Sequence, residues 1–252
     1  MYKKMQSFKK DNYKKSEDSS MVGERLESGI PGLDRVVEGG FVKNSINLIA
    51  GQTGTGKTLF AMQYLLHGLR KGENGLYISL EQAVDDVMMD VGNFGWDVEF
   101  KKYIQQGKFA IITQEPTSIK DLQDATLLNI KKLNAKRFVL DSLSIATMGW
   151  KVSSMDVGKI RSEIFTYMKL LKNSGITALL ITEIPEAETK SLSRFGFEEF
   201  LADSVIILHY LEYAAGGTPR SLLVRKMRRT SHGTDIYPIE ISNKGVVMKK
   251  AL

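Results

Sequence analysis

A glycine-rich segment carries the residue types best suited to bind a polyphosphate. It consists of Gly51, Gln52, Thr53, Gly54, Thr55, Gly56, Lys57 and Thr58, and it matches the complete pattern G-x-x-x-x-G-K-[S/T]. The glycines permit a tight loop whose main-chain N–H groups point inward at phosphate oxygens, and the helix that follows adds unpaired N–H donors. We expect Lys57 to reach the β- and γ-phosphates of a nucleotide and the Thr58 hydroxyl to bind Mg²⁺.

A carboxylate for the same metal ion is expected at Asp141. This residue follows the apolar run Phe138–Leu140 and matches the Walker B arrangement, in which a strand delivers an Asp to the Mg²⁺ shell. Apolar runs that end in Asp are common, so this run alone is weak evidence for a metal site. Because ligands of open α/β sheets bind at the carboxyl ends of the strands, its combination with the phosphate loop predicts a metal site made by Thr58 and Asp141.

Two further polar residues end strand-like runs at the same predicted edge. Glu81 follows the run Leu76–Leu80, where its carboxylate could polarise the water that attacks a γ-phosphate. Alternatively, Glu81 could have a structural role only, because a negative charge near its N-terminus stabilises the helix that follows. Thr182 ends the run Ile176–Thr182, and it could sense the γ-phosphate or merely cap the strand. The residues alone leave both alternatives open.

The elements that must position these residues alternate along the chain. Short β-rich runs are expected at Ser45–Ala50, Leu76–Leu80, Phe109–Thr113, Phe138–Leu140 and Ile176–Thr182, and helices at Lys57–Lys71, Val84–Phe94, Ile119–Leu133 and Ser154–Asn173. This order predicts an α/β fold with a mostly parallel sheet flanked by helices. The chain then ends in β-type runs without helices between them, at Ser204–Tyr210, Ser221–Lys226, Ile236–Ile241 and Val246–Met248. We expect these to form antiparallel strands at the edge of the sheet.

Composition excludes several classes of site. The 252 residues include no cysteine and three histidines, which excludes a disulfide framework, a thiolate metal site and a cysteine nucleophile and argues against a histidine-built metal centre. No apolar run approaches the ~20 residues that a membrane helix needs. With 42% hydrophobic and 25% charged residues, the composition is that of a soluble globular protein. We therefore expect a cytoplasmic location and no membrane partner.

The chain divides into a basic tail and one domain. Residues 1–20 contain six lysines and three acidic residues, which accounts for +3 of the net charge of +6. This stretch lacks hydrophobic periodicity and is interpreted as a disordered tail, with an arm that binds nucleic acid or a membrane surface as the alternative. Residues 21–252 show neither an internal repeat nor a linker, so we expect them to form a single domain.

Five motifs in combination resemble the KaiC-like branch of the RecA superfamily. They are Gly29–Asp34 (GIPGLD), Gly39–Gly40, Gly51–Phe60 (GQTGTGKTLF), Phe197–Asp203 (FEEFLAD) and Lys226–His232 (KMRRTSH). The resemblance covers about residues 22–250. Because each motif occurs once, the chain is similar to the single-domain archaeal-type homologues rather than to the two-domain clock protein. The resemblance implies a RecA-like P-loop NTPase core that binds ATP and Mg²⁺.

The same resemblance implies roles within a ring of subunits. Members are ATPases that commonly assemble into hexamers, with ATP between adjacent subunits. Glu81 matches the catalytic base, but the second acid of the usual pair is Gln82 here. Lys226 and Arg228 match residues that reach a neighbour's γ-phosphate, although basic residues at a strand end are usually solvated. Arg229 replaces the usual glycine. The nucleotide contacts that the resemblance implies are Gly51, Thr53, Gly54, Thr55, Gly56, Lys57, Thr58, Leu59, Met227, Thr230 and His232.

Other functions stay open from the sequence. Residues 186–197 (EAETKSLSRFGF) resemble in position the segment that lines the channel of RecA-type rings. Its candidates for contact with single-stranded DNA are Lys190, Arg194, Phe195 and Phe197, and the acids that oppose such contact are Glu186 and Glu188. A mobile loop without nucleic acid is the favoured interpretation. A recombinase paralogue that binds DNA, and a signalling module that phosphorylates itself or a partner, are the alternatives to a regulatory ATPase.

Overall fold

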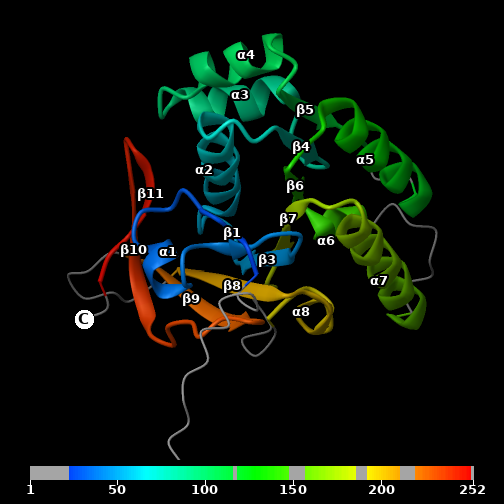
Figure 1. Ribbon diagram of the computed structural model, residues 1–252. Helices are drawn as coiled ribbons and strands as arrows, with labels where there is room; N and C mark the ends of the chain where they lie inside the picture. Colours follow the sequence, from blue (N-terminus) through cyan, green and yellow to red (C-terminus); the bar gives the residue numbers. More distant parts are fainter. Residues whose placement is uncertain (1–22, 116–117, 148–156, 186–191, 211–218, 251–252) are drawn as a thin grey trace, which may run out of the picture.

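A mixed sheet forms the centre of the molecule, and helices cover both of its faces (Figure 1). The computed structural model describes residues 23–115, 118–147, 157–185, 192–210 and 219–250, so the predicted tail lies outside the described residues. Within them the sheet has nine strands in the order β11-β10-β9-β8-β3-β7-β6-β4-β5. These are β3 (Ile46–Gly51), β4 (Gly75–Ser79), β5 (Phe109–Thr113), β6 (Arg137–Asp141), β7 (Thr177–Glu183), β8 (Ser204–Tyr210), β9 (Arg220–Met227), β10 (Ile236–Ser242) and β11 (Gly245–Met248).

Strand direction divides this sheet into two parts. From β8 to β5 the neighbouring strands are all parallel, whereas β9, β10 and β11 continue from β8 as antiparallel neighbours. The predicted α/β fold with antiparallel edge strands is confirmed. The prediction was wrong for the run Ser204–Tyr210, because β8 is parallel to β3 on one side and antiparallel to β9 on the other. An apolar β-run carries no information about its direction, which is set here by where the chain returns after β7.

Two groups of helices pack on the two faces of the parallel strands. On one face lie α2 (Lys57–Arg70), α3 (Val84–Gly92) and α4 (Asp97–Gln105), and on the other α5 (Ile119–Leu133) and α7 (Val157–Asn173). The shorter elements are α1 (Leu33–Val36), α6 (Leu143–Ala146), α8 (Glu198–Leu201), and a separate antiparallel pair of β1 (Arg25–Leu26) and β2 (Phe41–Val42). Among the described helices, none has the length and apolar content to cross a membrane.

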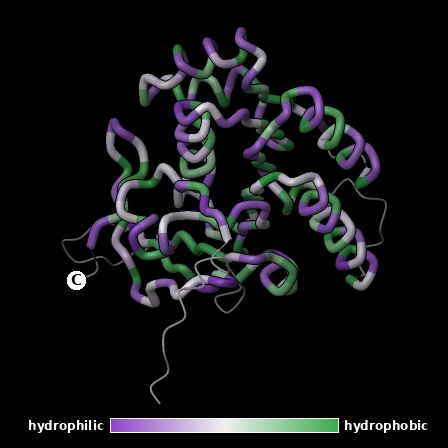
Figure 2. The backbone as a smooth tube through the Cα atoms, viewed as in Figure 1, coloured by the Kyte–Doolittle hydropathy of each residue, from purple (hydrophilic) through white to green (hydrophobic). Residues whose placement is uncertain are grey.

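Neighbouring residues of the central strands belong to different hydrophobic cores. In β4, Tyr77 packs into the core beneath α2, while Leu76 and Ile78 pack into the core beneath α5 and α7. A strand that is covered on both faces needs apolar residues at successive positions, which explains the continuous apolar runs in the sequence. The helices α5 and α7 differ from these strands, because hydrophobic and hydrophilic residues alternate along them (Figure 2).

The sequence did not predict α4, although the other long helices were expected. Its single buried residue is Phe100, whose ring lies 4.9 Å from that of Phe109 in β5, while Val98 is exposed. One buried residue in nine positions produces no apolar stripe of helical period. The first residues of the predicted helix Ser154–Asn173 lie outside the described residues, and α7 begins at Val157.

The carboxyl ends of four parallel strands lie at one edge of the sheet. Gly51 at the end of β3 is paired with Glu183 at the end of β7, and Ser79 at the end of β4 is paired with Asp141 at the end of β6. The loops that follow these strands therefore meet at the same place, as expected for a ligand site in an open α/β sheet.

Candidate active site

The phosphate loop joins β3 to α2 in the way that the sequence predicts. Gly54 and Gly56 have left-handed φ angles of 71° and 96°, which most L-amino acids disfavour. At Gly56 a Cβ atom would also lie 2.9 Å from the Ile241 side chain. Thr55 is buried and donates its hydroxyl to the Gln52 carbonyl at 2.8 Å, which closes the loop. Gly56 precedes α2 directly, so the loop leads into the helix N-terminus.

The ammonium group of Lys57 lies over this loop. Its Nζ donates to the carbonyl oxygens of Gly51 at 3.0 Å and Gln52 at 2.9 Å. Burial lowers the pKa of Lys57, and the nearby carboxylates of Glu183, Asp141 and Glu81 act in the opposite direction. The lysine is therefore a partly desolvated cation, already placed where a phosphate group would take over its hydrogen bonds.

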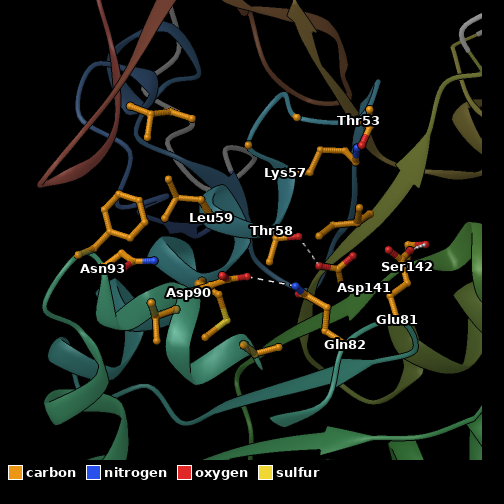
Figure 3. A pocket seen from close by; sticks show the side chains of 18 of the residues that line it. Thr53, Lys57, Thr58, Leu59, Glu81, Gln82, Asp90, Asn93, Asp141 and Ser142 are labelled. Atoms are coloured by element: carbon orange, nitrogen blue, oxygen red, sulfur yellow. Dashed lines mark hydrogen bonds between the residues drawn. The ribbon is translucent and has the colours of Figure 1, made fainter. Parts of the chain in front are cut away.

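Thr58 and Asp141 point toward each other and are in direct contact in the pocket (Figure 3). The Thr58 hydroxyl donates to Asp141 Oδ2 at 2.7 Å, and the buried hydroxyl of Tyr77 donates to the same oxygen at 2.7 Å. Burial raises the pKa of the Asp141 carboxyl, while these two hydroxyl groups lower it. A hydroxyl and a carboxylate are the hard oxygen ligands that Mg²⁺ prefers.

This pair of residues fits a magnesium ion better than an all-protein metal cage. Among the described residues no group of three or more His, Cys, Asp or Glu side chains could hold a metal ion. Mg²⁺ usually binds one or two protein oxygens and takes its other ligands from phosphates and water. Thr58 and Asp141 supply two such oxygens beside the phosphate loop.

Glu81 and Gln82 follow β4 at the same edge and point in different directions (Figure 3). Glu81 lines the pocket, and its Oε1 accepts a hydrogen bond from the Ser142 hydroxyl at 2.5 Å. Burial raises the pKa of Glu81, and the nearby charge of Asp141 adds to this effect. The Gln82 amide donates instead to Asp90 Oδ2 in α3 at 3.1 Å. Gln82 therefore joins the loop to α3, whereas Glu81 is the carboxylate that can act on a bound water.

The pocket around these groups has a volume of about 520 Å³ and two chemically different sides. Lys57 is the one basic residue among the described residues that line it, against the acids Glu81, Asp90, Asp141 and Glu183. Apolar residues of α2, α3, the segment after α3, and β10 form the other side, together with Asn93; they are Leu59, Met62, Val87, Val91, Phe94 and Ile241. The excess of acids means that a bound polyphosphate needs a cation beside it.

The sequence analysis did not predict Glu183 as a pocket residue. The structure also bears on the two alternatives for Thr182. Glu183 lines the pocket from β7, and its place one residue beyond a strand-like run was a signal comparable to that of Glu81. Thr182 is fully buried, and its hydroxyl lies 3.3 Å from the Ser144 hydroxyl. Its neighbours Ile181 and Glu183 line the pocket, whereas Thr182 belongs to the opposite face of β7. This favours the structural role for Thr182.

The late basic segment lies at the opposite edge of the sheet from the phosphate loop. Met227 of β9 is paired with Ser204 of β8, which is paired with Asn47 near the start of β3. The phosphate loop follows Gly51 at the other end of β3, a separation of ~13 Å along that strand alone. A single chain therefore does not bring Lys226 and Arg228 to the pocket.

Both basic side chains contact the end of α8. Lys226 Nζ donates to the carbonyl oxygens of Ala202 at 2.7 Å and Glu199 at 2.8 Å. Arg228 donates to the Phe200 carbonyl at 3.1 Å and lies 3.7 Å from an Asp203 carboxylate oxygen. The Arg228 side chain stays half exposed, so its charge can still reach another molecule.

The remaining residues of the segment form a turn. Arg229 has a left-handed φ of 59°, a conformation that glycine adopts more readily than any other residue. The Thr230 hydroxyl donates to the Arg228 carbonyl at 3.2 Å, and His232 Nδ1 lies 2.9 Å from the Gly233 carbonyl oxygen. Met227 is buried. None of these described residues lines the pocket of its own chain.

The predicted channel segment lies partly outside the described residues, including Glu186, Glu188 and Lys190. In its described part, Arg194 pairs with Glu183 at 3.8 Å. Phe195 and Phe197 stack on each other with 5.8 Å between ring centroids, and Phe197 is buried. An aromatic ring already used in the protein interior is poorly placed to stack on a base.

Replacing Tyr77 by Phe should destabilise the fold through Asp141. The substitution removes one of two hydroxyl donors to a buried carboxylate, and hydrogen bonds to charged groups contribute about 1.5–3 kcal/mol. We expect the free energy of unfolding in urea at neutral pH to fall by that amount. Tyr167→Phe is the matched control, because it removes a buried hydroxyl bonded to the neutral Thr126. An equal or larger loss in the control would mean that the Asp141 charge contributes nothing.

Comparisons with known proteins agree with this geometry. The family model "ATPase: KaiC" matches residues 26–252. A UPF0273 protein of Thermotoga maritima is 34% identical over 241 residues, which covers 89% of this chain and 95% of that protein. The circadian clock oscillator protein KaiC of Prochlorococcus marinus subsp. pastoris is 30% identical over 244 residues. That match covers 92% of this chain but 46% of the clock protein, so the chain spans about half of its length.

A solved structure matches the whole architecture. It is the crystal structure of a KaiC-like protein from the hyperthermophilic archaeon Pyrococcus horikoshii OT3, with a TM-score of 0.80 and 37% sequence identity. The match covers 90% of this chain and 100% of that one, as expected for a single-domain homologue. The family match, the relatives and the phosphate-loop geometry lead to one conclusion: the chain belongs to the KaiC family and is a KaiC-like ATPase domain of the RecA superfamily.

Proposed function

We propose that this chain hydrolyses ATP with Mg²⁺ in a homo-oligomeric, hexameric ring, with the nucleotide between adjacent subunits. The observation that carries the proposal is the division of the site. Lys57, Thr58, Asp141 and Glu81 share one pocket, whereas the half-exposed Arg228 lies at the opposite edge of the same sheet. A second copy of the chain can bring the two halves together. The relatives that are named circadian clock proteins support a regulatory role for the hydrolysis.

Binding uses the phosphate loop and its lysine. The main-chain N–H groups of the loop and Lys57 would hold the β- and γ-phosphates, with phosphate oxygens replacing the carbonyl partners that Lys57 has at Gly51 and Gln52. Because the pocket carries more acids than bases, a polyphosphate would be repelled without further positive charge. Thr58 and Asp141 would hold Mg²⁺, which supplies that charge and neutralises the phosphate oxygens.

Hydrolysis then requires a base for the attacking water. Glu81 would accept the proton as the water oxygen attacks the γ-phosphorus and the bond to the bridging β–γ oxygen breaks, which releases ADP and phosphate. The raised pKa makes Glu81 a stronger base than an exposed carboxylate. The hydrogen bond from Ser142 fixes the orientation of the carboxylate.

The neighbouring subunit would supply Lys226 and Arg228. Positive charge beside the γ-phosphate stabilises the charge that develops during phosphoryl transfer. Phe200 is 63% exposed and lies directly beside these residues, since Arg228 bonds to its carbonyl group. An exposed aromatic ring next to a functional arginine is what a contact surface for a second copy needs.

Removing the arginine should reduce turnover without reducing binding. We expect Arg228→Ala to lower kcat by about 10- to 100-fold, because Lys226 remains to share the charge, and to leave the Kd for ATP nearly unchanged. Phosphate release and nucleotide binding measure the two quantities separately. The matched control is Arg225→Ala, which removes an exposed arginine from the same strand and should leave kcat unchanged.

Mixing two variants with reduced activity tests whether the site is shared. Lys57→Ala keeps an intact Arg228, and Arg228→Ala keeps an intact phosphate loop, so mixed rings should regain activity above the sum of the separate variants. Co-purification of the two variants through a different affinity tag on each verifies that mixed oligomers form. Mixed oligomers without recovered activity, or full turnover by a monomer, would contradict the proposal. With γ-labelled ATP, label should appear as free phosphate; label retained on the protein would indicate phosphorylation instead.

A further inference from the structure

Arg25 connects the small β1–β2 sheet to the late basic segment. Its Nη1 donates to the Thr230 hydroxyl oxygen at 2.7 Å, and its Nη2 donates to the Arg229 carbonyl at 2.9 Å. The same guanidinium group also bonds to the Gly40 carbonyl at 3.3 Å and to the Glu38 carboxylate at 3.2 Å. The Arg25 side chain is 11% exposed, and its bonds to Thr230 and Gly40 are partly buried. The contact joins residues that lie 205 positions apart in the sequence.

These bonds fix the main chain of the turn that carries Arg228. The Thr230 hydroxyl accepts from Arg25 and donates to the Arg228 carbonyl, so the guanidinium acts on Arg228 through one intermediate group. Arg25 also holds the carbonyl of Arg229, a residue with a left-handed φ of 59°. A non-glycine residue in that conformation is strained and persists only where surrounding contacts impose it. Beyond the turn, Gly233 donates its N–H to the Val36 carbonyl at 2.9 Å and anchors the far end.

We propose that Arg25 is a positioning residue for ATP hydrolysis at the active site of a neighbouring subunit. It holds residues 228–230 in the turn from which Arg228 extends toward that site. The inference rests on the proposed function, because it requires Arg228 to act across the interface. Arg25 itself is tied to its own chain by four groups and has no part in binding the nucleotide.

The geometry requires an arginine rather than only a positive charge. Several groups around Arg25 are reached by the separate nitrogens of one planar guanidinium, which the single ammonium group of lysine cannot match. Arg25→Lys therefore keeps the charge opposite Glu38 but should lose the bonds that order the turn. Arg25→Met also removes the charge while it keeps much of the side-chain volume.

Kinetics of the two variants test the positioning role. We expect Arg25→Met and Arg25→Lys to lower kcat by about 10- to 100-fold, the loss typical of a displaced catalytic group, while KM and ring size stay close to the wild-type values. Lys43→Met is the matched control, since it removes a surface ion pair with Glu24 from the same small sheet and should leave kcat unchanged. A purely structural role would lower the melting temperature with an unchanged kcat, and that result would overturn the inference.

Mixing separates a failure of this inference from a failure of the proposed function. Arg25→Met has an intact phosphate loop and Lys57→Ala has an intact turn, so their mixed rings should regain activity above the sum of the two. The reference is the mixture of Arg228→Ala with Lys57→Ala. If the reference recovers and the Arg25 mixture does not, Arg25 acts within its own chain and only this inference fails. If neither mixture recovers although mixed rings form, the shared site itself is wrong.

Discussion

Lys57→Ala is expected to abolish ATP binding, with a Kd at least about 100-fold above the wild-type value. Lys57 is the one basic residue among the described residues that line the pocket, and its ammonium group lies over the phosphate loop. Each charge-assisted hydrogen bond to phosphate contributes about 1.5–3 kcal/mol, and 1.4 kcal/mol corresponds to a factor of ten in Kd. The substitution also leaves the Asp141 carboxylate without the nearby charge of Lys57, which adds repulsion of the phosphates.

Equilibrium binding of a fluorescent ATP analogue measures this effect. Lys101→Ala is a suitable control, because it removes an exposed lysine paired with Asp97 on α4 and should leave the Kd unchanged. A circular dichroism spectrum like that of the wild type shows that the variant is folded. Tight binding to a folded Lys57→Ala variant would mean that the phosphate loop is not the anchor of the nucleotide.

Glu81→Gln is expected to keep ATP binding and to lose about 10²- to 10⁴-fold in turnover, the usual contribution of a general base. Glutamine has the same shape and can still accept the hydrogen bond from Ser142, but it cannot take the proton of the attacking water. ATP affinity should stay equal or increase slightly, because one negative charge is removed from an acidic pocket. Single-turnover phosphate release at saturating Mg-ATP measures the chemical step directly.

A matched variant isolates the role of Glu81 from the effect of removing charge. Asp90→Asn removes another carboxylate of the same pocket, one that bonds to Gln82 rather than facing the phosphate loop, and should change turnover by less than a few-fold. Wild-type turnover by Glu81→Gln would show that the base is a different residue. Glu183 would then be the next candidate, because it lines the same pocket from the end of β7.

The sequence predicted those parts of the site that are encoded locally. The phosphate loop, Asp141 and Glu81 each follow a strand-like run, and the parallel arrangement of those strands places them at one edge. Glu183 follows the same rule but was not predicted, since the apolar run that predicts this strand ends at its neighbour Thr182. Side chains alternate between the two faces of a strand, so Glu183 faces the pocket and Thr182 faces the opposite side of β7.

Contacts between distant segments could not be predicted in this way. Tyr77 belongs to an apolar run, and nothing in that run indicates that its hydroxyl bonds to Asp141, 64 positions away. The bonds of Arg25 to Arg229 and Thr230 likewise depend on how β1 packs against the turn after β9. The direction of β8 was missed for a related reason, because it depends on the path of the chain and not on the composition of the strand.

The family resemblance supplied information that residue type alone did not. Basic residues at the end of β9 look like a solvated cluster, and only the resemblance implied a role at a neighbouring nucleotide. The left-handed conformation of Arg229 supports the alignment of motifs, because a glycine is the residue expected at such a position. The late basic segment and the phosphate loop lie at opposite edges of the sheet, which is compatible with the proposal of a site shared between subunits.

Calorimetric titration of the wild-type protein with Mg-ATP tests the central claim most directly, with Mg-free ATP and AMP as references. We expect saturable heat for one Mg-ATP per chain, much weaker binding of ATP without Mg²⁺, and no detectable binding of AMP, which lacks the β- and γ-phosphates that Lys57 would hold. Absence of heat with Mg-ATP, or equal affinity for AMP and Mg-ATP, would contradict the claim that the phosphate loop and Lys57 bind a polyphosphate together with its metal ion.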